Sequence, residues 1–239
     1  MSQLIVRLLG PPTVEWEGNF LPVPRRKVRA LFFRLALDMQ PVARDHLAFL
    51  LWCNECDTVA HRDLTHLITH LRNALPDPDL LQSTADFLFL DSRRIWCDTT
   101  AFMQLLHRHH AEPTAGYLVE AAGLARGVLL DGFSLDESPE FEEWLTIERS
   151  VWEHRHRAVR EALVRDSQSI GGSMGDTGLL MHSMHRAAGD DPIDPEVHRQ
   201  LIEGLLASGD TESVRRILDA IQRLTQVSQL AMMDRTHKR

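Results

Sequence analysis

Residues 61–75 read HRDLTHLITHLRNAL, and this stretch decides how the first half of the chain folds. Its apolar residues recur every three or four positions, the period of a helix buried along one side: Leu64, Leu67, Ile68, Leu71 and Leu75. The opposite face carries the polar residues Arg62, Thr65, His66, Thr69, Arg72 and Asn73. The stretch therefore predicts a helix that packs with one face and can bind a partner with the other.

Two further helices are expected before this stretch. From Arg25 onward, apolar residues again follow the helical period, at Val28, Leu31, Phe32, Leu35 and Met39. Pro41 interrupts this pattern, and Leu47, Leu50 and Leu51 mark a second, short helix that ends around Trp52. The eight residues that follow, CNECDTVA, are expected to form a polar linker to the third helix.

Short strands are expected on both sides of the three helices. Residues 4–10, LIVRLLG, are an apolar run that ends before two prolines, and TVEW alternates before a Gly-Asn turn, so a small N-terminal sheet is expected. Pro76 and Pro78 stop the third helix, and LLQST, DFLFL and IWCD then supply the strands of a terminal hairpin. The expected order is sheet, three helices and hairpin.

The second half of the chain is expected to be helical. A long helix is predicted from about Pro139 to Ser169. The tripeptide Gly-Asp-Thr begins at Gly175 and again at Gly209, a separation of 34 residues, which is the period of tetratricopeptide repeats. Chance recurrence of the tripeptide is the alternative. We expect two domains that meet near residues 98–102, where mixed strands give way to helical periodicity.

Composition indicates a protein of the cytoplasm. No apolar run approaches the roughly 20 residues that a membrane helix needs, and the first residues lack the basic start and cleavage site of a signal peptide. Three cysteines are too few, and odd in number, for a disulfide framework. A cytoplasmic protein without a membrane partner is therefore expected.

The net charge of -8 is unevenly distributed. Residues 1–98 hold 11 Lys and Arg against 12 Asp and Glu, a net charge of -1, which leaves -7 for residues 99–239. Within the first part, a basic cluster is formed by Arg25, Arg26, Lys27 and Arg29. A side that faces DNA is compatible with this local charge.

Eight strings of the sequence, taken in order, carry a resemblance to a known family. They are LLGPPTV, LPVPRRKVRALFFRLAL, ARDHLAFLLW, LITHLRNAL, WCDTTAF, LARGVLLDGF, EFEEWLTIER and DPIDPEVHRQLIEGLLASGDTESV. Their succession resembles the antibiotic regulatory protein (SARP) family of transcription activators. The resemblance implies a mainly α fold with small β elements: an OmpR-like winged helix-turn-helix (α+β) over residues 1–98, and an all-α, tetratricopeptide-like bacterial transcriptional activation domain over residues 99–239.

The resemblance also implies a function: sequence-specific binding to double-stranded promoter DNA near the -35 element, and activation by recruiting RNA polymerase through its sigma factor. The third helix would enter the major groove. DNA contacts are then implied for Arg62 (to phosphate), Thr65, His66, Thr69, His70, Arg72 and Asn73. In the loop over residues 53–59, contacts to the sigma factor are implied for Glu55, Asp57 and Thr58, because acidic groups suit a basic partner. The resemblance allows a homodimer on repeated half-sites.

The sequence departs from the family's pattern in two places. OmpR-like wings usually carry Gly and Arg at the tip, whereas the corresponding residues here are Thr84, Ala85 and Asp86. His70 stands where related helices often have an arginine that pairs with guanine. For Arg72, the alternative to base contact is a surface ion pair with Asp77 or Asp79. The alternative function is therefore a protein-interaction adaptor whose winged helix no longer binds DNA.

Metal and enzyme chemistry are the remaining alternatives. Cys53, Cys56, His61 and His66 include the ligand types of a zinc site, and the two cysteines have zinc-finger spacing. The spacing to the histidines is too short for a common finger, so ordinary thiols are preferred and no metal or other cofactor is expected. The many other histidines accompany no catalytic motif such as GxSxG, HExxH or a glycine-rich phosphate loop, so no catalytic residue and no enzyme activity are expected.

Overall fold

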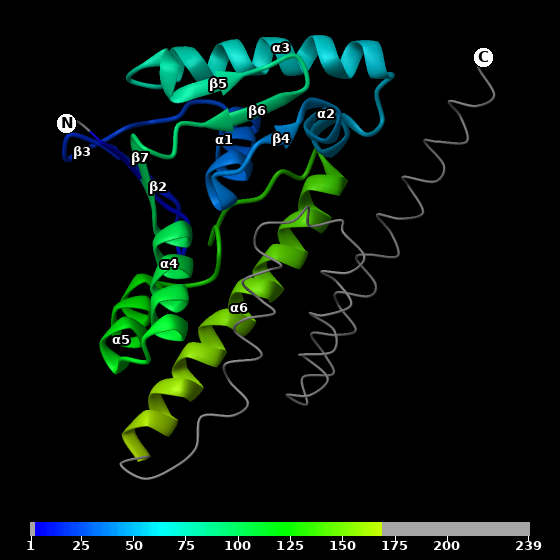
Figure 1. Cartoon of the computed structure of the whole chain (residues 1–239). Coiled ribbons are helices and arrows are strands. Elements are labelled where there is room, and N and C mark those ends of the chain that lie inside the picture. The colour runs from blue at the N-terminus through cyan, green and yellow to red at the C-terminus, as the bar shows by residue number, and fades with distance from the viewer. Residues whose placement is uncertain (1–2, 169–239) are drawn as a thin grey trace.

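The computed structural model describes residues 3–168 of this chain (Figure 1). Its first part contains β1 (Leu4–Arg7), β2 (Thr13–Trp16), β3 (Asn19–Phe20), α1 (Arg26–Asp38), β4 (Val42–Ala43), α2 (Arg44–Trp52) and α3 (Asp57–Ala74). After these come the short 3-10 helix η1 (Pro78–Leu80), β5 (Leu81–Ser83), β6 (Phe87–Leu90), β7 (Ile95–Cys97), α4 (Asp98–Ala111), α5 (Ala115–Leu124) and α6 (Pro139–Gln168). Both copies of Gly-Asp-Thr lie outside the described residues, so the expected repeat stays a prediction.

The three helices expected in the first half are confirmed as α1, α2 and α3. The apolar residues that predicted α3 are all buried. However, α3 begins at Asp57, so the prediction of a polar linker as far as residue 60 was wrong. The buried Ala60 extends the apolar stripe by one turn, and the Asp57 carboxylate in the first turn is favoured by the helix dipole.

The strands form two small sheets rather than one sheet and one hairpin. The N-terminal sheet is confirmed by the antiparallel pairing of β1 with β2 and of β2 with β3. The predicted hairpin contains only β5 and β6, and β4 pairs with the other edge of β6. The third strand assigned to the hairpin, IWCD, was placed wrongly, because β7 pairs in parallel with β1. Ile95 and Cys97 are buried opposite Leu4 and Val6, and this pairing covers their apolar faces.

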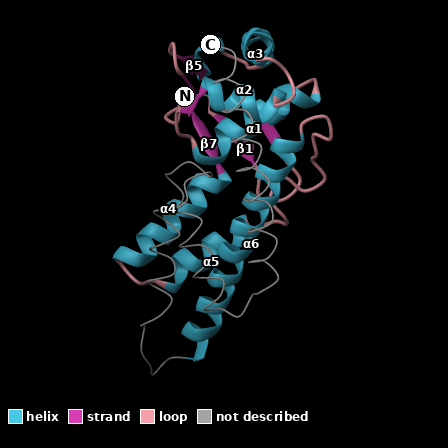
Figure 2. Cartoon of the chain, turned by 90° about the vertical axis from the view of Figure 1, so that its right-hand side faces the viewer, coloured by secondary structure: helices cyan, strands magenta, loops and turns pink. Residues whose placement is uncertain are grey.

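Helices α4, α5 and α6 extend away from the strands, and α3 lies at the opposite end of the molecule (Figures 1 and 2). The predicted long helix at Pro139 is confirmed as α6. The chain between α5 and α6 is not helical, and its Leu129 forms a β-bridge with Leu9. The Arg149 guanidinium of α6 holds this segment by donating to the carbonyl oxygens of Leu129, Leu130 and Phe133 at 3.0, 2.8 and 2.9 Å.

Apart from Ile147, the buried apolar residues that the structure describes form a single cluster that continues past residue 98. The Asp98 carboxylate accepts hydrogen bonds from the backbone N–H groups of Leu8 and Leu9, at 2.7 and 3.0 Å. Phe102 of α4 packs edge-on against Trp152 of α6, with ring centroids 5.4 Å apart. The division into two domains near residues 98–102 stays a prediction, since a shared core does not show whether the two parts fold separately.

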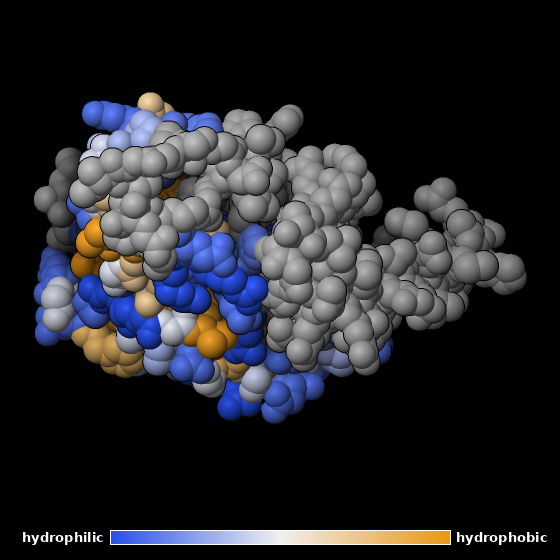
Figure 3. Space-filling view, turned by 90° about the horizontal axis from the view of Figure 1, so that it is seen from below, coloured by the Kyte–Doolittle hydropathy of each residue, from blue (hydrophilic) through white to orange (hydrophobic). Residues whose placement is uncertain are grey.

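The described surface at the α4–α6 end is largely hydrophilic with scattered apolar residues (Figure 3). Exposed apolar side chains there include Val119 and Val128. Within residues 3–168, none of the helices combines the length and the apolar character needed to span a bilayer.

Candidate nucleic-acid interface

The outer face of α3 is open to solvent. Six of the seven residues predicted to contact DNA are exposed there: Arg62, Thr65, His66, Thr69, His70 and Asn73. The seventh, Arg72, is half-buried. At 3.6 residues per turn, His70 and Arg72 lie along opposite edges of this face, and the other five lie between or near them. The structure therefore brings the predicted residues onto one face of one helix.

Arg44, which sequence reasoning missed, lies along the Thr65 edge of this face. Its guanidinium donates to the hydroxyl oxygens of Ser83 and Thr65, at 3.2 and 3.4 Å. Its backbone N–H donates to the Asp86 carbonyl oxygen at 2.8 Å. One residue at the start of α2 thus connects the outer face of α3 to the turn between β5 and β6, which is the wing of the predicted winged helix.

Arg25 lies along the other edge of the face, beside His70. Its Nη1 is 2.6 Å from His70 Nε2. Because a guanidinium has only donors, this contact is a hydrogen bond in the tautomer whose Nε2 accepts. The backbone of Arg25 has φ 66 and ψ 126, a conformation that costs a non-glycine residue about 1–3 kcal/mol. Arg25 therefore places a cation beside His70 at this edge of the face.

The two threonines of the face present methyl groups and oxygen lone pairs to solvent. The Thr65 hydroxyl donates to the His61 carbonyl oxygen at 2.9 Å, and the Thr69 hydroxyl donates to the Thr65 carbonyl oxygen at 3.1 Å. Each proton is thereby used within the helix. The hydroxyl oxygens keep lone pairs, although Thr65 Oγ1 already accepts one hydrogen bond from Arg44. These oxygens can accept from an amino group of adenine or cytosine, and the threonine methyl groups can contact the methyl group of thymine.

The two arginines of α3 differ in their partners. Arg62 pairs with Asp63 on its own helix, at 2.9 Å. Arg72 makes no ion pair with any residue that the structure describes. Asp77, one of the two aspartates considered as an alternative partner of Arg72, binds the Arg94 guanidinium at 2.7 Å, and this hydrogen bond holds the pKa of Asp77 below its usual range. The Arg72 side chain is thus not committed to the pair weighed as its alternative role.

The residues predicted to contact the sigma factor gather at the N-terminal end of α3. The loop between α2 and α3 is shorter than the predicted 53–59, because Asp57 and Thr58 belong to the first turn of the helix. Glu55 lies in the loop, where its backbone N–H donates to the Trp52 carbonyl oxygen at 3.1 Å. All three side chains are exposed. Glu55 and Asp57 make the N-terminal end of α3 acidic, and the cationic residues of the helix lie farther along it.

The cysteines and histidines near this loop are used in other contacts. His61 Nδ1 lies 2.7 Å from the Asp57 carbonyl oxygen, and its Nε2 lies 2.8 Å from the Asp45 carboxylate. The Asp45 hydrogen bond, with the carbonyl, raises the pKa of His61. Burial, assisted by Glu140, raises the pKa of Cys53 to about 12. Across residues 3–168, no three His, Cys, Asp or Glu side chains form a group that could hold a metal ion.

Comparison with known proteins gives a likeness in fold. No protein-family model and no curated protein sequence matches this chain. Among solved structures, the chain is similar to Mycobacterium tuberculosis EmbR, determined in complex with a low-affinity phosphopeptide. The TM-score is 0.53 at 19% sequence identity, and the match covers 98% of this chain and 72% of the EmbR chain. At this identity the likeness concerns the fold alone: this chain has a helix-rich, EmbR-like fold with small sheets.

Proposed function

We propose that this protein is a transcription regulator that binds double-stranded DNA through the outer face of α3 and activates by contacting RNA polymerase. The observation that carries the proposal is an exposed polar helix face with an arginine along each edge, Arg25 and Arg44. The resemblance of the sequence to the SARP family and the likeness in fold to EmbR support it. The protein would then act by binding, without catalysis.

The dimensions and charges of this face suit the major groove. The groove is about 12 Å wide and admits one α-helix, so α3 can insert while residues along its edges meet the sugar-phosphate backbone on each side. Arg44 and Ser83 lie along one edge and Arg25 along the other. Phosphate contacts position a helix, and contacts from its centre read bases. The resemblance to the SARP family adds a finer assignment, in which Thr69 and Arg72 read bases or line the groove and Arg62, near the start of α3, contacts phosphate.

Charge divides α3 into two functional parts. Its N-terminal end lies near four acidic side chains, which disfavour contact with phosphate: Asp45, Glu55, Asp57 and Asp63. The middle and C-terminal part lies near Arg25, Arg44 and Arg72. Apart from the phosphate contact of Arg62, DNA would therefore contact the middle and C-terminal part, and Glu55, Asp57 and Thr58 would stay free for a basic surface of the polymerase. This division supports the proposed contact of Glu55, Asp57 and Thr58 with the sigma factor.

Alanine variants of the two arginines test DNA binding. Arg72→Ala should weaken binding to the preferred duplex by about 1–3 kcal/mol and relax discrimination, because a base contact is lost. Arg62→Ala should weaken binding to all duplexes alike and reduce the salt slope by about 0.9, because one phosphate contact is lost. Each variant is titrated against two duplexes at two salt concentrations. One duplex carries the preferred site, selected from a random pool, and the other carries the same bases in scrambled order.

The matched control is Arg160→Ala, which removes an exposed arginine from α6. It should leave both affinity and salt slope unchanged. Duplexes with one or two copies of the selected site test the homodimer, because a homodimer binds the second copy cooperatively. If both α3 variants bind and discriminate as the wild type does, the adaptor function is favoured over DNA binding.

The acidic end of α3 is tested by separating transcription from DNA affinity. Glu55→Gln combined with Asp57→Asn removes two charges and keeps the size and the polar character of both side chains. Transcription from a linear template by purified polymerase should fall several-fold, while DNA affinity stays unchanged or rises slightly, since acidic groups oppose phosphate. Glu120→Gln, an exposed acid on α5, serves as the control. A loss of promoter binding in the double variant would contradict the assignment.

A further inference from the structure

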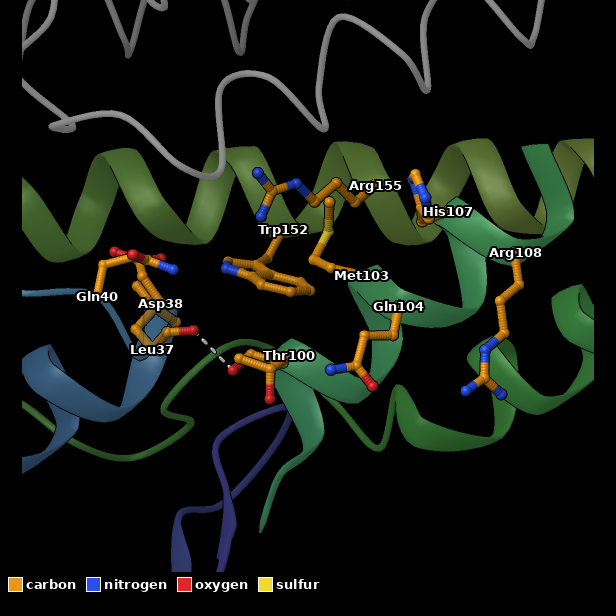
Figure 4. A pocket seen from close by; sticks show the side chains of 11 residues that line it. Leu37, Asp38, Gln40, Thr100, Met103, Gln104, His107, Arg108, Trp152 and Arg155 are labelled. Carbon is orange, nitrogen blue, oxygen red and sulfur yellow. Dashed lines mark hydrogen bonds between the residues drawn. The ribbon is translucent and has the colours of Figure 1, made fainter. Parts of the chain in front are cut away.

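A pocket of about 440 Å³ opens between the C-terminal end of α1, helix α4 and helix α6 (Figure 4). Leu37 and Asp38 of α1 line it together with Met103 of α4 and Trp152 of α6. This volume lies within the roughly 300–1,000 Å³ of pockets that hold small molecules. The pocket lies away from the outer face of α3, and the proposed DNA contacts use none of its residues.

Trp152 contributes an unused hydrogen-bond donor to this pocket. The side chain is 2% exposed, and its Nε1–H has no hydrogen-bond partner among the described residues. Figure 4 shows the indole across the middle of the pocket, with its ring nitrogen on the side of Asp38 and Gln40. A buried donor without an acceptor costs about 1–3 kcal/mol. A ligand atom that accepts from Nε1 would remove that cost.

Positive charge prevails around the same space. The Arg155 guanidinium lies over the Trp152 ring, 4.6 Å from its centroid, and stays charged although burial lowers its pKa. The one carboxylate of the lining, Asp38, is already paired with Arg34 at 3.1 Å. Glu148 does not line the pocket. Burial, followed by repulsion from the Asp38 carboxylate, raises its pKa to about 7. The lining itself holds two guanidinium groups, those of Arg155 and Arg108, against the single paired carboxylate of Asp38, which favours an anionic ligand.

Apart from His107 and Arg108 of α4, the rest of the lining is apolar or neutral. Leu37 and Met103 contribute flexible aliphatic surface, and a methionine adapts to flat ring systems. Thr100 and Gln104 add neutral polar groups on α4. A ligand that fits has a planar apolar body and one negatively charged acceptor.

We propose that this pocket binds a small aromatic carboxylate, with the carboxylate at Trp152 Nε1 and Arg155 and the ring against Met103 and Leu37. The site lies where α1, which also packs against α3, meets the helices that follow residue 98. The proposal does not depend on DNA binding, and it is tested by binding alone.

The test is isothermal titration of the full chain with 1-naphthoate as the probe. One molecule should bind per chain with a Kd below about 1 mM, and the neutral analogue 1-naphthalenemethanol should bind at least about tenfold more weakly. Trp152→Phe deletes the N–H and replaces the indole by a smaller aromatic ring, so naphthoate affinity should fall at least about tenfold.

Two further variants make the result decisive. Trp144→Phe changes an indole on the same helix that does not line the pocket, so it should leave naphthoate affinity unchanged. Met103→Trp should fill the pocket from a half-exposed position and abolish binding while the chain stays folded. If naphthoate fails to bind at roughly 1 mM, or binds equally well to Met103→Trp, the proposal is wrong. Met103→Trp decides the matter even if Trp152→Phe does not fold.

Discussion

Replacing Asp98 by alanine should lower the free energy of unfolding by about 3–5 kcal/mol. The Asp98 side chain is 1% exposed. It accepts from the backbone N–H groups of Leu8 and Leu9 and lies 3.5 Å from the Arg126 guanidinium. Alanine would leave both N–H groups buried without an acceptor, at a site that water does not reach. The loss is large because the carboxylate connects the end of β1 to the start of α4.

Urea unfolding of the full chain, followed by circular dichroism, measures this loss. Asp98→Asn keeps one acceptor oxygen and should lose less stability than Asp98→Ala. Asp131→Ala removes an exposed carboxylate close to the same segment and should change stability by less than about 0.5 kcal/mol. A loss below about 1 kcal/mol for Asp98→Ala would show that the two N–H groups find other acceptors, against the structure.

Phe102→Ala should cost a similar amount, about 3–5 kcal/mol, through lost packing. The Phe102 ring is fully buried and lies edge-on to Trp152 and to His156, with centroids 5.4 and 5.3 Å away. The cavity left by alanine lies between α4 and α6, and two helices anchored elsewhere can collapse into it only in part. Thermal and urea unfolding measure the effect.

Phe87→Ala is the matched control, because this phenylalanine is 45% exposed on the wing and should matter much less. The same curves test the expected division near residues 98–102. Two separated transitions, of which Phe102→Ala shifts only the later part of the chain, would show that the two parts unfold independently. A single transition that shifts as a whole would show that the shared core makes them one unit.

Local periodicity explains most of what the sequence predicted about this fold. The stripe that includes Leu64 and Leu71 has the period of a helix whatever surrounds it, and α6 shows the same kind of signal. The start of α3 was missed because its first turn holds polar residues and only Ala60 faces the core. The partner of β7 was missed because a three-residue strand alternates in the same way beside either neighbour, and tertiary packing chooses between them.

In the candidate interface, too, local periodicity predicts some residues and tertiary packing places the others. The exposed residues of α3 follow from the helical period, so their shared face could be predicted. Arg25 and Arg44 could not be placed there from the sequence, because only tertiary packing brings them to α3. Arg25 is 45 residues from His70 in the sequence, and Arg44 is 21 residues from Thr65. The pocket at Trp152 was invisible for the same reason, since its lining comes from three helices.

The parallel pairing of β1 with β7 has a consequence for how the chain folds as it is synthesised. Leu4 of β1 pairs with Ile95, so about 90 further residues must be made before that edge of β1 is covered. At the usual rates of translation this takes roughly 5–20 s, while α1, α2 and α3 can form from local contacts. During that interval β1 has an open edge that other chains can pair with. Strand β1 is therefore made before the three helices, and its pairing is completed only when β7 follows them.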